Sequence, residues 1–108
     1  FNLPLASGTG GSSIRSGWRD DLLPSVVAAK PDLIIISAGF DAHEADPLGG
    51  LQMTSDDFGI LTNDIIDAAN EAAEHSGAVR LVSLLEGGYD LYALGQSVCQ
   101  HMSALESI

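Results

Sequence analysis

Basic residues are scarce in this sequence. Its 108 residues include 4 Lys or Arg against 15 Asp or Glu, which gives a formal net charge of -11 at pH 7. Proteins that bind nucleic acids neutralise phosphates with Lys and Arg, so this balance argues against a nucleic-acid partner. The negative charge is compatible with a cationic substrate such as a lysine-bearing peptide or a polyamine, although acidic surfaces also serve solubility alone.

Cysteines and long apolar runs are also lacking. The single cysteine, Cys99, rules out an internal disulfide and fits a reducing compartment. The expected location is therefore cytoplasmic, or nuclear in a eukaryote. No apolar run approaches the roughly 20 residues of a transmembrane helix, so no membrane association is expected. The first residues, FNLPL, lack an initiator Met and a basic signal-peptide region, so we expect the chain to begin inside a longer protein.

The pattern that remains is typical of an α/β domain. Hydrophobic residues make up 45% of the chain and charged residues 18%, an ordinary globular composition. Strands are predicted over residues 1–5, 33–37 and 79–85, and helices over residues 13–29, 54–76 and from 90 onward. This alternating order implies parallel strands joined by right-handed crossovers.

Local signals predict where these helices begin and which faces they bury. Thr54 and Asp57 have the spacing of a capping box, and Asp90 can cap the final helix. Pro24 is expected to kink the first helix. The inner face of the final helix is predicted to consist of apolar side chains at helical spacing, namely Leu91, Leu94, Val98, Met102 and Leu105.

Three strands and three helices are few for a parallel sheet of this kind. Such a sheet needs helices on both faces, and its outer strands would here present unpaired edges. The sequence contains no internal repeat and no linker. We therefore expect one unit that is part of a larger sheet.

Asp41 directly follows the predicted strand at 33–37, within the segment SAGFDAH. Loops beyond the carboxyl ends of parallel strands are where ligands and metals sit. A carboxylate binds zinc well, but a catalytic zinc takes three protein ligands. The alternative is that Asp41 caps the turn after the strand. His43 could join the same metal, yet a surface loop histidine, or one that hydrogen-bonds the loop backbone, is favoured.

The remaining histidines and the cysteine carry weaker signals. His75 is predicted at a helix end, where a protonated imidazole suits the helix dipole. His101 lies beside the apolar stripe of the last helix and has no obvious partner. Cys99 is expected to be a small buried hydrophobic residue.

Tyr89 follows Gly87 and Gly88 at the end of the strand predicted at 79–85. The two glycines permit unusual backbone angles and the close approach of a substrate. A phenol at this position can donate a hydrogen bond to a carbonyl oxygen that becomes negative during attack. The alternative is a tyrosine that packs over a tight turn.

A glycine-rich loop, GTGGS at 8–12, precedes the first helix. Such loops can cradle phosphates at a helix start. This one lacks the full G-x-G-x-x-G pattern and the lysine of a P-loop. An active-site rim or a plain connector is therefore favoured over a nucleotide site.

Taken together, these segments resemble the carboxyl-terminal half of the catalytic domain of the histone deacetylase superfamily. The similarity is greatest to class II enzymes and to bacterial deacetylase-like and acetylpolyamine amidohydrolases. The motifs occur in family order across nearly the whole chain, as NLPL with GTG, KPDLI, SAGFDAH, DPLGGL and LEGGYDL. The resemblance implies an arginase/deacetylase-like fold with helices on both faces of a parallel sheet, and residues 1–108 as the carboxyl-terminal portion of a single catalytic domain.

The resemblance also implies zinc-dependent hydrolysis of N-acetyl amides, on acetyl-lysine or a similar acylated amine. In the family's pattern, Asp41 would be one of the Asp/His/Asp ligands of Zn²⁺, and Tyr89 would polarise the acetyl carbonyl. Leu48 would line the substrate tunnel near its mouth, with Gly87 and Gly88 in the tunnel wall. An apolar Leu48 favours acetyl-lysine or another neutral acyl amide over a polyamine.

Two family motifs would lie upstream of Phe1. These are the paired histidines that handle protons and the Asp-x-His segment that carries the other two zinc ligands. We therefore expect the missing amino-terminal half of the domain to be the partner of this chain, and the chain alone to be inactive. The alternatives are a non-catalytic acidic α/β interaction module derived from the same fold and, more weakly, a nucleotide-binding fold.

Overall fold

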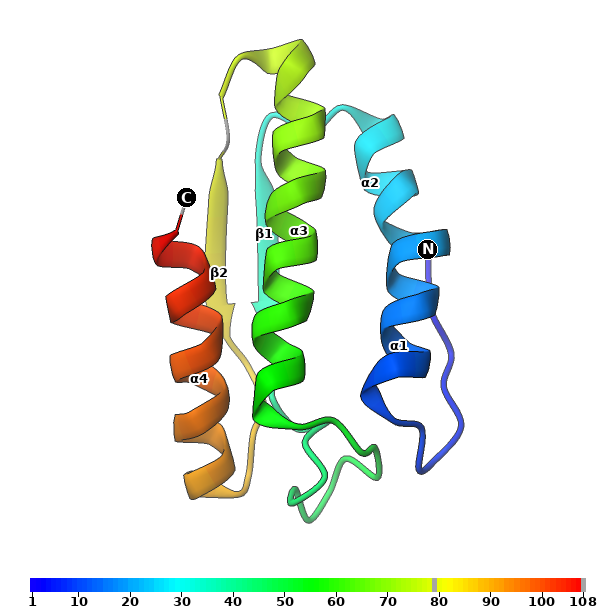
Figure 1. The fold of residues 1–108 in the computed structure, drawn as a ribbon, viewed down its shortest axis with the longest axis vertical. Helices are drawn as coiled ribbons and strands as arrows, with labels where there is room; N and C mark the ends of the chain where they lie inside the picture. The colour runs from blue at the N-terminus through cyan, green and yellow to red at the C-terminus, as the bar shows by residue number, and fades with distance from the viewer. Residues whose placement is uncertain (79, 108) are drawn as a thin grey trace.

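The computed structural model describes residues 1–78 and 80–107, apart from the side chains at 75 and 76. The expectations for the His75 side chain and for Val79 lie outside this part. The chain forms a strand layer with helices packed against it (Figure 1). In chain order the elements are α1 (Gly11–Gly17), the π-helical η1 (Trp18–Leu22), α2 (Leu23–Ala29), β1 (Ile34–Ala38), α3 (Ser55–Ser76), β2 (Leu81–Leu85) and α4 (Leu91–Glu106).

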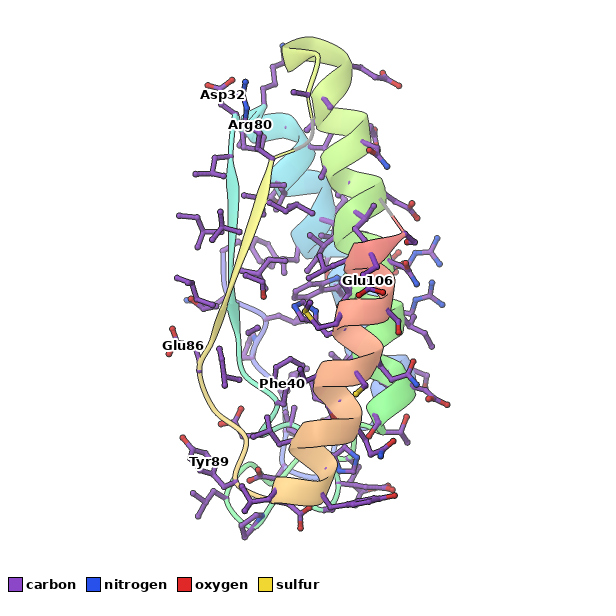
Figure 2. The ribbon with its side chains drawn as sticks, turned by 90° about the vertical axis from the view of Figure 1, so that its left-hand side faces the viewer. Asp32, Phe40, Arg80, Glu86, Tyr89 and Glu106 are labelled. Carbon is purple, nitrogen blue, oxygen red and sulfur yellow. The ribbon has the colours of Figure 1, made fainter. Side chains whose placement is uncertain are left out.

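The strands β1 and β2 form a parallel pair in which Ile34 lies opposite Leu81 and Ala38 opposite Leu85. The predicted α/β class with parallel strands is therefore confirmed. The helices of the described residues lie on one face of this pair (Figure 2). Side chains that point to the other face stay exposed, and Ile35 keeps 60% of its surface accessible.

The amino-terminal segment is not the strand predicted at 1–5. Residues 1–6 have no regular structure, and the first bridge that follows is an isolated one between Gly10 and Gln52. A strand exists only by pairing, and no strand of the described chain lies alongside this segment. Instead Leu3 packs closely against Gly17 of α1.

The first helical region spans α1, η1 and α2 and agrees with the helix predicted at 13–29. Its regular α-helical pattern is interrupted by η1, which immediately precedes α2 with its Pro24. Proline cannot donate a hydrogen bond to the preceding turn and its ring crowds the carbonyl there, so a widened π-helical turn accommodates it. The region ends at Lys30 in a left-handed conformation with φ 48°.

Helix α3 begins with the predicted capping box. The Thr54 hydroxyl accepts from the Asp57 backbone N–H at 3.4 Å, and the Asp57 carboxylate accepts from the Thr54 N–H at 2.8 Å. The helix ends at Gly77, whose φ of 76° is left-handed. None of the helices in the described part of the chain combines the length and apolar character needed to cross a bilayer.

The buried face of α4 agrees with the prediction only in part. Asp90 caps the helix as expected, accepting from the Ala93 N–H at 2.9 Å. Leu91, however, is 82% exposed, and Met102 is also exposed. Leu94 and Val98 are partly buried and pack against the core, as predicted. The most deeply buried residues of α4 are three small ones and a histidine, namely Ala93, Ser97, Ala104 and His101. Cys99 is exposed as well, so its predicted burial is wrong.

His101 has partners that the sequence did not reveal. The Thr62 hydroxyl donates to the Phe58 carbonyl at 2.6 Å, so it accepts from His101 Nδ1–H at 2.7 Å. The other ring nitrogen, Nε2, then accepts from the Ser83 hydroxyl at 2.8 Å. The ring also lies edge-on to Phe40, with centroids 5.6 Å apart. His101 therefore joins α3, β2 and α4 beneath the residue that precedes Asp41.

We expect stability to depend on the protonation of His101. Burial lowers the pKa of His101, and the partners named above are uncharged. Unperturbed histidine has a pKa of about 6.5, so below that pH the unfolded state binds a proton before the folded state does. The free energy of unfolding is therefore highest above about pH 6.5 and declines as the pH falls, until the pH lies below the folded-state pKa. Denaturant unfolding on both sides of this pH measures the decline, and His101→Gln should remove it. An unchanged pH dependence in His101→Gln would contradict this assignment.

Candidate functional site

The loops that follow β1 and β2 lie side by side at the carboxyl ends of the strands. Backbone pairing continues past the strands, with Glu86 N–H donating to the Ala38 carbonyl at 2.9 Å and Phe40 N–H to the Gly87 carbonyl at 2.8 Å. Phe40 is anchored in the core, where its ring meets that of Phe58 at 5.1 Å between centroids. The residue after Phe40 is Asp41, so the core fixes the position of this carboxylate.

Two glycines enclose the Asp41 carboxylate. A Cβ atom on Gly87 would lie 2.9 Å from Asp41 Oδ2, and one on Gly39 would lie 3.1 Å from Oδ1. A Cβ on Gly49 would overlap the Asp41 carbonyl oxygen. The carboxylate thus occupies a cradle that only residues without side chains leave open.

Tyr89 lies just beyond this cradle. Gly88 has φ 138°, and a Cβ there would come within 2.7 Å of the Leu94 side chain. The chain therefore turns sharply at Gly88 and emerges at Tyr89, which is 55% exposed. Figure 2 shows Tyr89 beyond the strand ends, lower than Phe40 and on the outer side of the molecule.

Leu48 stands on the long loop between β1 and α3 and is 71% exposed. This loop is held at its base, where Met53 N–H donates to the Ala42 carbonyl at 3.0 Å. The glycine-rich amino-terminal loop packs against it, since Gly8 N–H donates to the Gly50 carbonyl at 2.7 Å. The GTG segment is therefore hydrogen-bonded to the loop that carries Leu48.

Asp46 is a residue of this site that the sequence analysis named only within the DPLGGL motif. Its Oδ1 accepts from the N–H groups of Leu48 at 2.8 Å and Gly49 at 3.0 Å, and its Oδ2 accepts from Tyr89 N–H at 2.8 Å. Desolvation opposes ionisation of this carboxyl. The backbone N–H groups, including that of Asp90, outweigh desolvation and lower the pKa of Asp46.

His43 is engaged with the loop rather than directed at a shared metal. Its Nδ1 accepts from Ala45 N–H at 3.0 Å, so Nε2 carries the proton toward the Ser55 hydroxyl at 3.1 Å. This agrees with the favoured interpretation of a histidine that hydrogen-bonds the loop backbone. Both histidines with described side chains, His43 and His101, therefore have both ring nitrogens engaged.

Among residues 1–78 and 80–107, no three His, Cys, Asp or Glu side chains gather in a way that could hold a metal ion. Asp41 can supply one donor, from an enclosed position at the strand ends. The donor chemistry fits zinc, but a zinc site would need further ligands from outside the described residues.

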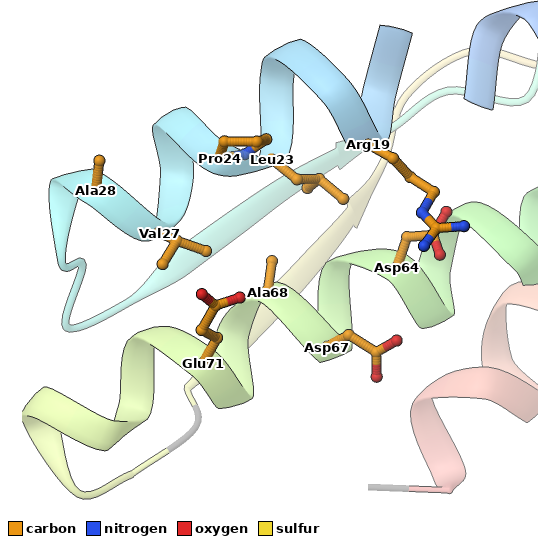
Figure 3. A pocket seen from close by; sticks show the side chains of 9 residues that line it. All are labelled: Arg19, Leu23, Pro24, Val27, Ala28, Asp64, Asp67, Ala68 and Glu71. Atoms are coloured by element: carbon orange, nitrogen blue, oxygen red, sulfur yellow. The ribbon is translucent and has the colours of Figure 1, made fainter. Parts of the chain in front are cut away.

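A separate groove of about 380 Å³ lies in the helical layer between α2 and α3 (Figure 3). Apolar side chains such as Leu23 and Val27 line it, together with carboxylates of α3 that include Asp64 and Glu71. Asp64 is already paired with Arg15, at 2.9 Å. The groove shares no residue with the loops after β1 and β2, so it is distinct from the candidate site.

Comparisons with known proteins give matches over nearly the whole chain. Residues 1–105 match the family model described as the histone deacetylase domain. The chain is 43% identical to "Histone deacetylase 10, chloroplastic" of Oryza sativa subsp. japonica over 104 residues, 96% of this chain and 23% of the relative. It is 36% identical to the "Histone deacetylase-like amidohydrolase" of Pseudomonas aeruginosa over 110 residues, 99% of this chain and 28% of the relative.

Among solved structures, the HDA15 HD domain superimposes with a TM-score of 0.78 at 33% identity, covering 93% of this chain and 26% of that one. The chain thus spans about a quarter of the length of these relatives. The rice relative carries the word "chloroplastic" in its name, a location different from the cytoplasmic one expected from the single cysteine. The cellular location of this chain stays a prediction.

Proposed function

The chain belongs to the histone deacetylase family, and from this premise we propose that it is the carboxyl-terminal portion of a zinc-dependent catalytic domain. The domain would hydrolyse N-acetyl amides on lysine side chains or on similar amines. The chain spans about a quarter of the length of its relatives, so the proposed activity belongs to the complete protein that contains this chain.

One observation carries the proposal. The Asp41 carboxylate lies at the carboxyl end of β1, enclosed by Gly39 and Gly87, in the same pair of loops that carries Tyr89. This edge of a parallel sheet is where ligands bind in α/β proteins. The chain matches the deacetylase family over nearly its full length. Acyl hydrolysis would need a carboxylate and a phenol from this part of the domain, and Asp41 and Tyr89 supply these groups at that edge.

Asp41 would hold the zinc ion together with ligands from outside this chain. When bound there, zinc would supply Lewis-acid polarisation of the acyl oxygen and a water of lowered pKa. The cradle of glycines would keep the carboxylate oriented, and Asp41 stays partly exposed, which would leave room for a ligand.

The other residues of the chain would bind and orient the substrate. The Tyr89 phenol would donate a hydrogen bond to the acyl oxygen as negative charge develops there, an interaction that is stronger in the transition state than in the ground state. Gly87 and Gly88 would let the substrate amide approach the backbone closely. The exposed Leu48 would offer an apolar contact at the mouth of the substrate tunnel. Proton transfer to the leaving amine would come from residues outside the described part of the chain, since the rings of its two histidines, His43 and His101, are engaged.

Gly87→Ala is expected to weaken zinc binding by the complete protein about 10- to 100-fold, the usual cost of disturbing a group that orients a metal ligand. The reason is that the new Cβ would lie 2.9 Å from Asp41 Oδ2 and must displace the carboxylate. A zinc titration against a competing chelator measures the change. Gly95→Ala is the matched control, because nothing lies within 4 Å of a Cβ at that position. Equal zinc affinity in the two variants would contradict the proposed position of the metal.

The experiment that tests the function compares acetate release from an acetyl-lysine peptide by the complete protein and by residues 1–108 alone. We expect release by the complete protein and none by the isolated chain, because one carboxylate cannot hold a catalytic zinc. Zinc-dependent release by the isolated chain, free of contaminating enzyme, would refute the assignment of the remaining ligands to the rest of the domain. Absence of release by the zinc-loaded complete protein would favour a non-catalytic interaction module.

A further inference from the structure

The Asp46 side chain connects the two loops of the candidate site. Both of its oxygens are used, Oδ1 by the N–H groups of Leu48 and Gly49 in its own loop, and Oδ2 by the Tyr89 N–H in the loop after β2. Two of these donors have a place in the proposed function, Leu48 at the mouth of the substrate tunnel and Tyr89 at the acyl oxygen. One carboxylate therefore fixes their backbones relative to each other.

Tyr89 needs such an anchor because the chain leading to it has little intrinsic rigidity. Gly87 and Gly88 precede it, and glycine has more backbone freedom than other residues. The Tyr89 side chain is more than half exposed, so packing restrains it little. A hydrogen bond from its N–H to an ionised carboxylate is of the short, strong kind and is suited to hold the backbone in place.

We propose that Asp46 is a positioning residue that holds Tyr89 and Leu48 in register across the two loops, so that the phenol meets the acyl oxygen of a substrate that has passed Leu48. The inference rests on the proposed function for its catalytic consequence. The connection between the loops itself does not depend on that function.

The test uses two variants of the complete protein. Asp46→Asn keeps the shape of the side chain but replaces one acceptor oxygen with a donor. Asp46→Ser is too short to reach Tyr89 but can still accept from an N–H in its own turn, as serine does in such turns. Asp20→Asn, an exposed carboxylate on η1, is the control. Thermal unfolding confirms that each variant is folded.

We expect both Asp46 variants to lower kcat by about 10- to 100-fold, because a displacement of about 1 Å at a reacting group costs up to about 100-fold. Zinc content should be unchanged. In a Tyr89→Phe background the same substitutions should change kcat less than about threefold, because residues that act as a unit are not additive. A purely structural role would lower kcat by the same factor in both backgrounds, and that result would overturn the proposal.

Hydrogen exchange gives a second measurement that needs no activity. In Asp46→Ser the Tyr89 amide should exchange faster than in the parent protein, while the amides within α3 stay unchanged. If the parent protein hydrolyses no acyl amide, the proposed function has failed, and the Tyr89 amide alone decides whether Asp46 ties the loops. Unchanged exchange at Tyr89, or kcat within twofold of an active parent, would overturn the proposal.

Discussion

Replacing Asp41 with alanine in the complete protein is expected to lower kcat/KM for an acetyl-lysine peptide by at least about 1,000-fold. A metal ion that polarises a carbonyl contributes several kcal/mol to the transition state, and about 1.4 kcal/mol corresponds to a factor of ten. The cradle formed by Gly39 and Gly87 holds the Asp41 carboxylate itself, so a side chain that lacks this group leaves the metal without that ligand.

Zinc content per protein molecule, measured by atomic spectroscopy after dialysis, checks the cause of this loss. The Asp41→Ala protein should retain much less zinc than the parent protein. Asp20→Ala, which removes an exposed carboxylate on η1, should retain the parent's zinc and activity. If Asp41→Ala keeps full zinc and loses activity, Asp41 acts on the substrate or on a proton rather than on the metal. If it keeps full activity, the site lies elsewhere.

Tyr89→Phe is expected to lower kcat by about 100- to 1,000-fold, the cost of losing one hydrogen-bond donor to a developing oxyanion. KM should change little, because the bond strengthens only as negative charge develops on the acyl oxygen. Zinc content should be that of the parent protein, which distinguishes this variant from Asp41→Ala. Steady-state kinetics over a range of substrate concentrations separates the two parameters.

Tyr92 offers a matched control for Tyr89. It lies in the first turn of α4, three positions further along, and is 80% exposed. Removing its hydroxyl in Tyr92→Phe should leave kcat unchanged. A Tyr89→Phe protein that behaves like Tyr92→Phe would show that the Tyr89 phenol takes no part in the reaction.

The adjacency of the loops after β1 and β2 could be predicted from the sequence because it depends on short-range patterns. The apolar run before Asp41 predicted β1, and the glycines before Tyr89 marked the end of β2. The alternating order of elements then predicted that the two ends meet at one edge, as they do. The capping box at Thr54 is equally local.

The features that escaped prediction depend on contacts between distant residues. The His101 ring bonds to Thr62 and Ser83, which lie on other elements. The role of Asp46 at Tyr89 likewise requires two loops to fold against each other. The predicted buried stripe of α4 was right for Leu94 and Val98, which pack against the core, and wrong for Leu91 and Met102, which are exposed.

The measurement that tests the account most directly is acetate release from an acetyl-lysine peptide by the complete protein, before zinc removal, after chelation and after zinc is restored. We predict activity that disappears with the chelator and returns with zinc in the parent protein, and no recovery in Asp41→Ala. Activity that survives complete removal of zinc, or recovery in Asp41→Ala equal to that of the parent, would contradict a zinc-dependent acyl site built on Asp41.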